Sequence, residues 1–182
     1  MAHQFTTSYL EDSLTLFRHY KKMTEHAMEQ LAPEQFYAAL DPEMNSIAVL
    51  IKHMTGNMRS RWRDFLTTDG EKPDRDRDNE FTEPPATREG LLKLWEDGWG
   101  YVFGALEPLS EADLGRQVTI RGEPHSVMQA INRQIAHYGS HCGQIIFLAK
   151  HLQHENWKSL TIPRKGSAEY NSRVLSGEAS QR

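Results

Sequence analysis

The sequence has one cysteine, no long hydrophobic run and no excess of basic residues. A lone cysteine, Cys142, cannot form an internal disulfide bond, so no oxidising compartment is implied. No segment approaches the ~18–20 apolar residues that a membrane-spanning helix needs, and the first residues lack the pattern of a signal peptide. With 21 Lys and Arg against 25 Asp and Glu, the net charge of −4 argues against binding to nucleic acid. We therefore expect a cytoplasmic protein with no membrane or nucleic-acid partner.

The composition is that of a globular chain with an excess of histidine. Of 182 residues, 38% are apolar and 12 are glycine, which excludes an intrinsically disordered chain. The length favours one domain, which we place at residues 1–171. The end of the chain, residues 172–182, is rich in serine, glycine and charge, and we expect it to be a mobile tail. Nine histidines are the unusual feature.

Apolar residues recur at three- and four-residue steps in four long segments, which is the pattern of amphipathic helices. The predicted helices are residues 8–31, 46–67, 87–106 and 126–152. Four such helices with no convincing pair of strands predict an all-α protein, specifically a four-helix bundle.

Two connecting segments need separate interpretation. Residues 69–86 contain three prolines and alternate acidic with basic side chains, and we interpret them as a solvated loop. Residues 116–124 are compatible with a β-strand but are too short and isolated for a sheet, so we expect a connector there.

A pair of histidines on the last helix has the spacing of a metal site. His137 and His141 are four residues apart, so their side chains point within about 40° of each other, one helical turn apart. Two imidazoles placed this way can chelate one ion. The pair lies on the flank of the apolar face, where a site would be open to a substrate. The alternative is a solvated pair with ordinary hydrogen bonds.

The second predicted helix offers a third ligand. His53 lies on the flank of its apolar stripe, and side chains from facing helices converge in a bundle. Three neutral imidazoles leave coordination positions for water or substrate, which is typical of a catalytic metal site. Asn57 and Arg61 continue the same polar row. Asn57 could accept a hydrogen bond from a metal-bound histidine, and Arg61 could bind an anionic substrate. Alternatively, Asn57 is exposed and Arg61 pairs with a surface carboxylate.

Other residues bear on the site or on the packing of the helices. Gln134 and His125 are candidates to face the site from the last helix and from just before it. Cys142 lies on the apolar face and is more typical of a buried residue than of a nucleophile. Glycines within helices indicate close approach of helices or subunits; they are Gly56, Gly139 and Gly143. Four tryptophans indicate surplus apolar surface and favour a homodimer; they are Trp62, Trp95, Trp99 and Trp157.

Two segments carry a resemblance to a known superfamily. Residues 137–145 (HYGSHCGQI) resemble the last-helix His-x-x-x-His-x-Gly-Gln-Ile motif of the DinB-like (YfiT-type) superfamily, and residues 51–62 (IKHMTGNMRSRW) resemble its second-helix histidine segment. Shorter segments are similar to an uncharacterised bacterial branch with a domain-of-unknown-function name; they are residues 67–73, 118–125 and 162–164. The resemblance spans about residues 8–171.

The resemblance implies a four-helix bundle of the DinB/YfiT-like metalloprotein type, commonly a homodimer, with zinc or nickel held by His53, His137 and His141. The superfamily includes S-transferases that use bacillithiol or mycothiol, and members described as metal-dependent hydrolases. We therefore expect a metal-dependent enzyme that activates a low-molecular-weight thiol for transfer to a small electrophile. The alternatives are a hydrolase using metal-bound water and a non-catalytic metal-binding or stress-response dimer. No acidic residue in the polar row is placed as a general base, which favours thiol transfer.

Overall fold

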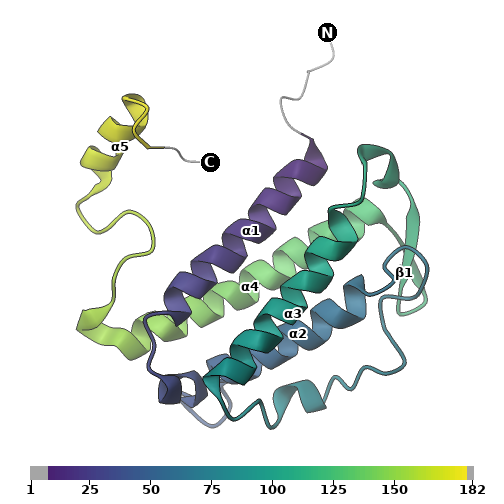
Figure 1. Cartoon of the computed structure of the whole chain (residues 1–182), viewed down its shortest axis with the longest axis horizontal. Helices are drawn as coiled ribbons and strands as arrows, with labels where there is room; N and C mark the ends of the chain where they lie inside the picture. Colours follow the sequence, from purple (N-terminus) through teal and green to yellow (C-terminus); the bar gives the residue numbers. More distant parts are fainter. Residues whose placement is uncertain (1–7, 180–182) are drawn as a thin grey trace.

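The computed structural model describes residues 8–179, and 61% of these residues are helical. The described part contains five α-helices and one two-stranded sheet (Figure 1). The predicted all-α class is confirmed at this level. Within the described residues, no helix is both long and apolar enough to cross a lipid bilayer.

Four long helices correspond to the four predicted segments. They are α1 (Tyr9–Met28), α2 (Ile47–Trp62), α3 (Arg88–Leu106) and α4 (Val127–Gln153). Each begins after a serine or threonine whose hydroxyl accepts a hydrogen bond from the backbone N–H three residues later; these caps are Ser8, Ser46, Thr87 and Ser126. Helix α2 ends five residues before its predicted end, because Arg63 is extended and Asp64 has a φ of 49°.

The four helices pack around one hydrophobic core. Helix α1 lies along α4, and α2 lies along α3 (Figure 1). Aromatic side chains join them: Phe17 of α1 meets the rings of Trp62 and Trp99 edge-on, with centroids 6.4 and 6.2 Å apart. The indole N–H of Trp62 donates to the hydroxyl of Tyr138 at 2.9 Å. Trp62, Trp95 and Trp99 are each at most 2% exposed, so they offer no surface for a partner subunit.

Residues 117–126 form a β-hairpin, which corrects the prediction of a connector. Strands β1 (Gln117–Ile120) and β2 (Glu123–Ser126) pair antiparallel through a two-residue turn, and both turn residues, Arg121 and Gly122, have positive φ. The carboxylate of Asp69 accepts hydrogen bonds from both turn N–H groups at 2.8 Å. This contact with a distant segment stabilises a hairpin that is too short to form alone.

The segment between α2 and α3 is not the solvated loop predicted for residues 69–86. Lys72 and Glu80 are buried, and the side chain of Arg75 is only 4% exposed. A 3-10 turn, η2 (Asn79–Phe81), packs on α2. Arg75 and Glu80 form a buried ion pair, and Asp74 forms an exposed one with Arg59 of α2. The loop therefore buries part of the charge that its composition predicted to be solvated, while residues 76–78 stay exposed.

The chain ends in a fifth helix, α5 (Ser167–Leu175), which lies apart from the four long helices in Figure 1. None of its residues is buried. The predicted boundary between residues 171 and 172 falls within α5, and the division into residues 1–171 and a tail stays a prediction. Residues 1–7 and 180–182 of that division lie outside the described residues.

Candidate metal centre

Three histidines from two helices meet at one point. His53 comes from α2, and His137 and His141 come from α4. Each ring offers one nitrogen, and these nitrogens all lie within 4.8 Å of one another. His53 is 4% exposed, and the other two rings are half-buried. The structure thus brings together the three residues that the sequence predicts as metal ligands.

The rings of His53 and His141 are oriented by hydrogen bonds on the far side from this point. Nδ1 of His53 lies 2.9 Å from a carboxylate oxygen of Glu80, and Nδ1 of His141 lies 2.9 Å from Oε1 of Gln144. Both oxygens are acceptors, so each Nδ1 is placed to donate its proton to them and each Nε2 is the nitrogen that remains to bind a metal. An oxygen acceptor behind the ring is the usual arrangement for a metal-binding histidine.

The spacing of the remaining nitrogens suits a shared cation. Nε2 of His137 lies 3.1 Å from Nε2 of His141. Two imidazole nitrogens bound tetrahedrally to one zinc ion would be ~3.3 Å apart, given bonds of ~2.0–2.1 Å. The donor set therefore fits a divalent ion. His137 differs from the other two in that its buried Nδ1 has no hydrogen-bond partner among the described residues.

Burial keeps the two α4 histidines neutral. Desolvation, followed by the nearby His141 and His53, lowers the pKa of His137 to about 3. Burial also lowers the pKa of His141, and this effect outweighs its hydrogen bond to Gln144. Neutral imidazole is the form that binds a metal, so these ligands need not lose a proton at neutral pH.

Glu80 is a site residue that the sequence analysis missed. Its side chain comes from η2 and reaches His53 across Gly56 of α2. A Cβ at Gly56 would lie 2.5 Å from Oε1 of Glu80, so this glycine provides the room for the carboxylate. The prediction that Gly56 marks a close approach of helices or subunits is wrong in that respect, because the approaching group is a loop side chain.

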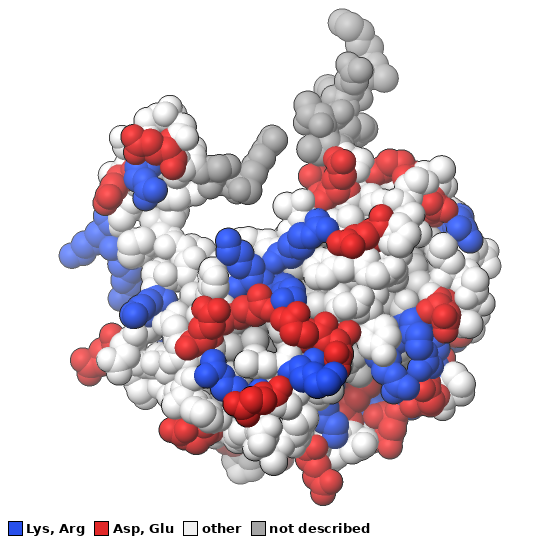
Figure 2. All heavy atoms as spheres, viewed as in Figure 1, with Lys and Arg blue, Asp and Glu red and all other residues white. Residues whose placement is uncertain are grey.

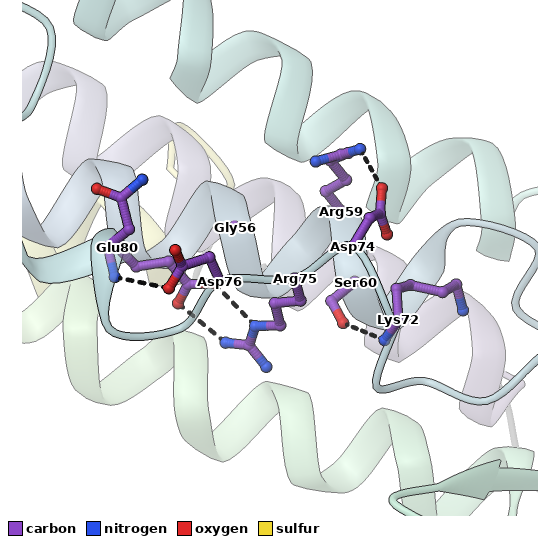
Figure 3. A pocket seen from close by; sticks show the side chains of 9 residues that line it. Gly56, Arg59, Ser60, Lys72, Asp74, Arg75, Asp76 and Glu80 are labelled. Atoms are coloured by element: carbon purple, nitrogen blue, oxygen red, sulfur yellow. Dashed lines mark hydrogen bonds and ion pairs between the residues drawn. The ribbon is translucent and has the colours of Figure 1, made fainter.

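Arg75 holds the same carboxylate from the other side. Its Nε and a terminal nitrogen donate to the two oxygens of Glu80 at 2.7 and 3.0 Å (Figure 3). Burial raises the pKa of Glu80, but the hydrogen bonds from His53 and Arg75 outweigh burial and leave the pKa below its ordinary value. Glu80 is therefore an ionised hydrogen-bond acceptor. No sequence signal separated it from the other acidic residues of its loop.

Asn57 and Arg61 are both buried. For Asn57, the sequence analysis offered an exposed side chain or a hydrogen bond with a metal-bound histidine, and the structure shows neither. The amide oxygen of Asn57 accepts from the hydroxyl of Tyr138 at 3.1 Å and not from a histidine, whose partner is Glu80 instead. Arg61 donates to the carbonyl of Gly70 and to Glu71, the latter at 3.1 Å. Arg61 is thus paired with a carboxylate, as one alternative held, but only 6% of its side chain is exposed.

A cavity of about 350 Å³ opens beside the three histidines. Asn57, Arg61 and Gln134 line it, and the buried amide oxygen of Gln134 has no hydrogen-bond partner among the described residues. His125 does not line this cavity; its Nδ1 lies 3.0 Å from the carbonyl of Glu123. The site therefore combines a three-nitrogen donor set with open space for a small molecule.

A family model described as "Protein of unknown function (DUF1572)" matches residues 4–166, which is most of the chain. No curated protein matches the sequence.

Proposed function

The chain belongs to the DUF1572 family of proteins of unknown function, and we propose that it is a metal-dependent enzyme whose ion is held by His53, His137 and His141. The observation that carries the proposal is the common point of the three imidazole nitrogens, within 4.8 Å of one another and beside a cavity of about 350 Å³. A purely structural ion is enclosed by four protein ligands, whereas catalytic sites have three and an open position. Zinc and nickel both suit imidazole ligands.

The reaction we propose is transfer of a low-molecular-weight thiol to a small electrophile. A divalent ion at this site supplies Lewis acidity, which lowers the pKa of a thiol or water that binds to it. The thiol sulfur forms a bond to the electrophilic carbon, the leaving group departs with its bonding pair, and the thiol proton passes to solvent. The chain's residues bind and orient: Glu80 and Gln144 fix two of the rings, and the cavity holds the electrophile.

Hydrolysis is the second candidate, and the cavity lining favours thiol transfer over it. Among the described residues, no Asp or Glu lines the cavity, and Glu80 is occupied by His53 and Arg75. Water activation in zinc enzymes commonly uses a carboxylate base, whereas a thiol has a pKa of ~8.5 and loses its proton readily near neutral pH. A non-catalytic metal-binding dimer is the remaining alternative.

The finer architecture is part of this proposal. We propose that the four long helices form a four-helix bundle of the DinB-like type, on the basis of the two histidine segments and the pairing of α1 with α4 and α2 with α3.

We also propose a homodimer. Phe147, on α4, is 63% exposed and is the kind of apolar side chain that a second copy would cover. Light scattering measures this, and a monomeric mass at micromolar concentration would contradict it.

Elemental analysis tests the metal first. Tag-free protein purified without chelator should contain close to one zinc or nickel ion per chain. Cysteine, glutathione, bacillithiol and mycothiol should then be tried with a chromogenic aryl chloride, following chloride release. Turnover that requires both thiol and metal supports the transferase. Ester hydrolysis without thiol supports the second candidate, and metal-free protein at full yield contradicts both.

A further inference from the structure

The cavity beside the histidines is surrounded by arginine. Five arginines line it: Arg61, Arg75, Arg77, Arg121 and Arg133. They come from α2, from the loop after it, from the hairpin turn and from α4, so the fold collects them from four separate segments. The chain as a whole has a net charge of −4, and on the face in Figure 2 basic side chains are interspersed with acidic ones. The lining of the cavity differs, because among the described residues it includes five arginines and no Asp or Glu.

The carboxylates nearby do not balance this charge. Glu80 pairs with Arg75, and Glu71 is shared by Arg61, Arg75 and Arg121. Within residues 8–179, Arg133 has no hydrogen bond or ion pair, and the guanidinium of Arg77 has no ion pair and lies over the ring of Phe81, with its Cζ 5.3 Å from the centroid. Within residues 8–179, the ion pairs of these five guanidinium groups involve only two carboxylates, so positive charge predominates around the cavity.

Buried polar atoms of the cavity also lack partners. Nε of Arg61 and Oε1 of Gln134 are buried without a hydrogen bond in the described part of the chain, and both side chains line the cavity. Arg61 is 5% exposed and Gln134 is 2% exposed. Buried donors and acceptors nearly always have hydrogen-bond partners in folded proteins, which indicates that a ligand supplies the partners of these two atoms.

Arg121 occupies a backbone position that ordinarily selects a different residue. It is the first central residue of a two-residue hairpin turn with φ of 56°, followed by Gly122 with φ of 78°. Turns with positive φ at both positions favour Asn-Gly or Asp-Gly, because a larger side chain is disfavoured there. An arginine in a disfavoured backbone conformation at the rim of a cavity points to a role for its side chain in binding.

We propose that this cavity binds a small organic dianion, a molecule with two carboxylates or a phosphate, through its arginines and Gln134. The forked guanidinium group matches carboxylate and phosphate oxygens with paired hydrogen bonds, which explains why the cations lining the cavity are all arginine. Its volume of about 350 Å³ suits a small metabolite. Taken with the proposed function, on which this last step rests, the acidic groups anchor the substrate while its reacting atom faces the histidines.

Calorimetry on the purified full chain tests the assignment with matched probes. Succinate and glycerol 3-phosphate are the dianions, and succinamide and glycerol are their neutral counterparts. At least one dianion should bind with one-to-one stoichiometry, with an affinity that falls as salt increases, while its neutral counterpart should not bind. The succinate and glycerol 3-phosphate arms separate a carboxylate site from a phosphate site. Equal binding of dianion and neutral counterpart, or no binding by either dianion, overturns the proposal.

Three variants test whether the arginines bind the dianion independently of the metal. Arg121→Asn and Arg133→Gln should each weaken dianion binding about tenfold or more, and Arg121→Asn should not lower the thermal midpoint because asparagine suits the turn. Arg164→Gln removes an exposed arginine that does not line the cavity, and it should leave dianion binding unchanged. Dianion binding unaffected by the first two variants overturns the proposal. Metal content measured on the same samples tests the proposed function independently, so that either can fail alone.

Discussion

The carboxylate of Glu80 accepts a hydrogen bond from Nδ1 of His53 at 2.9 Å, although the two residues are 27 positions apart in the chain. Both are buried, at 5% and 4% exposure. The contact fixes which nitrogen of His53 carries the proton and directs its Nε2 toward His137 and His141. It links the charged loop after α2 to the candidate metal centre.

Replacing any one histidine of the centre should remove the metal. His53→Ala, His137→Ala and His141→Ala each delete one of three protein ligands, so metal content by elemental analysis should fall to near zero while the far-ultraviolet circular dichroism stays helical. His151→Ala, an exposed histidine on the same helix as two of the ligands, is the matched control and should keep full metal content. Full occupancy in the three ligand variants would show that the ion binds elsewhere.

Glu80→Gln should weaken the metal site without removing a ligand. Gln cannot supply the negative charge that orients and polarises His53, and losing such a partner costs roughly 10–100-fold in metal affinity. Competition with a chromogenic chelator measures the affinity. Asp78→Asn neutralises an exposed carboxylate two residues away and should leave the affinity unchanged. Equal affinities for both variants would show that Glu80 does not position His53.

Two glycine substitutions should have opposite effects on stability. Gly56→Ala places a methyl group 2.5 Å from Glu80, so we expect a loss of about 1–3 kcal/mol in the free energy of unfolding and weaker metal binding. Gly100→Ala, in α3, has no neighbour within 4 Å and should stabilise the helix by about 0.5–1 kcal/mol. Urea titration measures both. A neutral effect of Gly56→Ala would mean that the loop shifts freely.

The single cysteine should be unreactive in the folded protein. Cys142 is 2% exposed, and burial raises the pKa of its thiol to about 12, despite a smaller opposing effect of the hydrogen bond with Thr24. Because the pKa is raised, the reactive thiolate is scarce at every pH below about 12. A colorimetric disulfide reagent at pH 8 should label the unfolded chain at least ~100-fold faster than the native one. Comparable rates would show that Cys142 is accessible.

Asn57 should affect a different property from the one first expected of it, whereas Arg61 should affect the binding of an anion, as first expected. Asn57→Ala removes the acceptor of the Tyr138 hydroxyl, so it should lower stability by about 1–3 kcal/mol with little change in metal affinity. Arg61→Ala should leave metal content unchanged and weaken binding of an anionic ligand, since Arg61 lines the cavity and is not one of the proposed metal ligands. Chelator competition and urea titration on both variants check these outcomes, and a weakened metal site in Asn57→Ala would contradict them.

The sequence by itself determined the four long helices and singled out the three histidines that the structure brings together. Helical periodicity places His137 and His141 one turn apart on one face, and this follows from local geometry alone. His53 lies on the flank of another apolar stripe, so burial of both stripes in one core places all three histidines at the edge of that core. For the same reason Cys142, on the apolar face of α4, is buried as expected.

Only the tertiary structure decided which loop residues reach the centre. Glu80 and Arg75 lie in a segment without periodicity, and nothing local distinguishes them from the acidic and basic residues around them. Their burial depends on Gly56, which leaves room on α2, and the hairpin depends on Asp69, which accepts from both turn N–H groups. Side-chain contacts between distant segments set these positions, whereas the pattern of a sequence reports only which face of its own helix or strand a residue occupies.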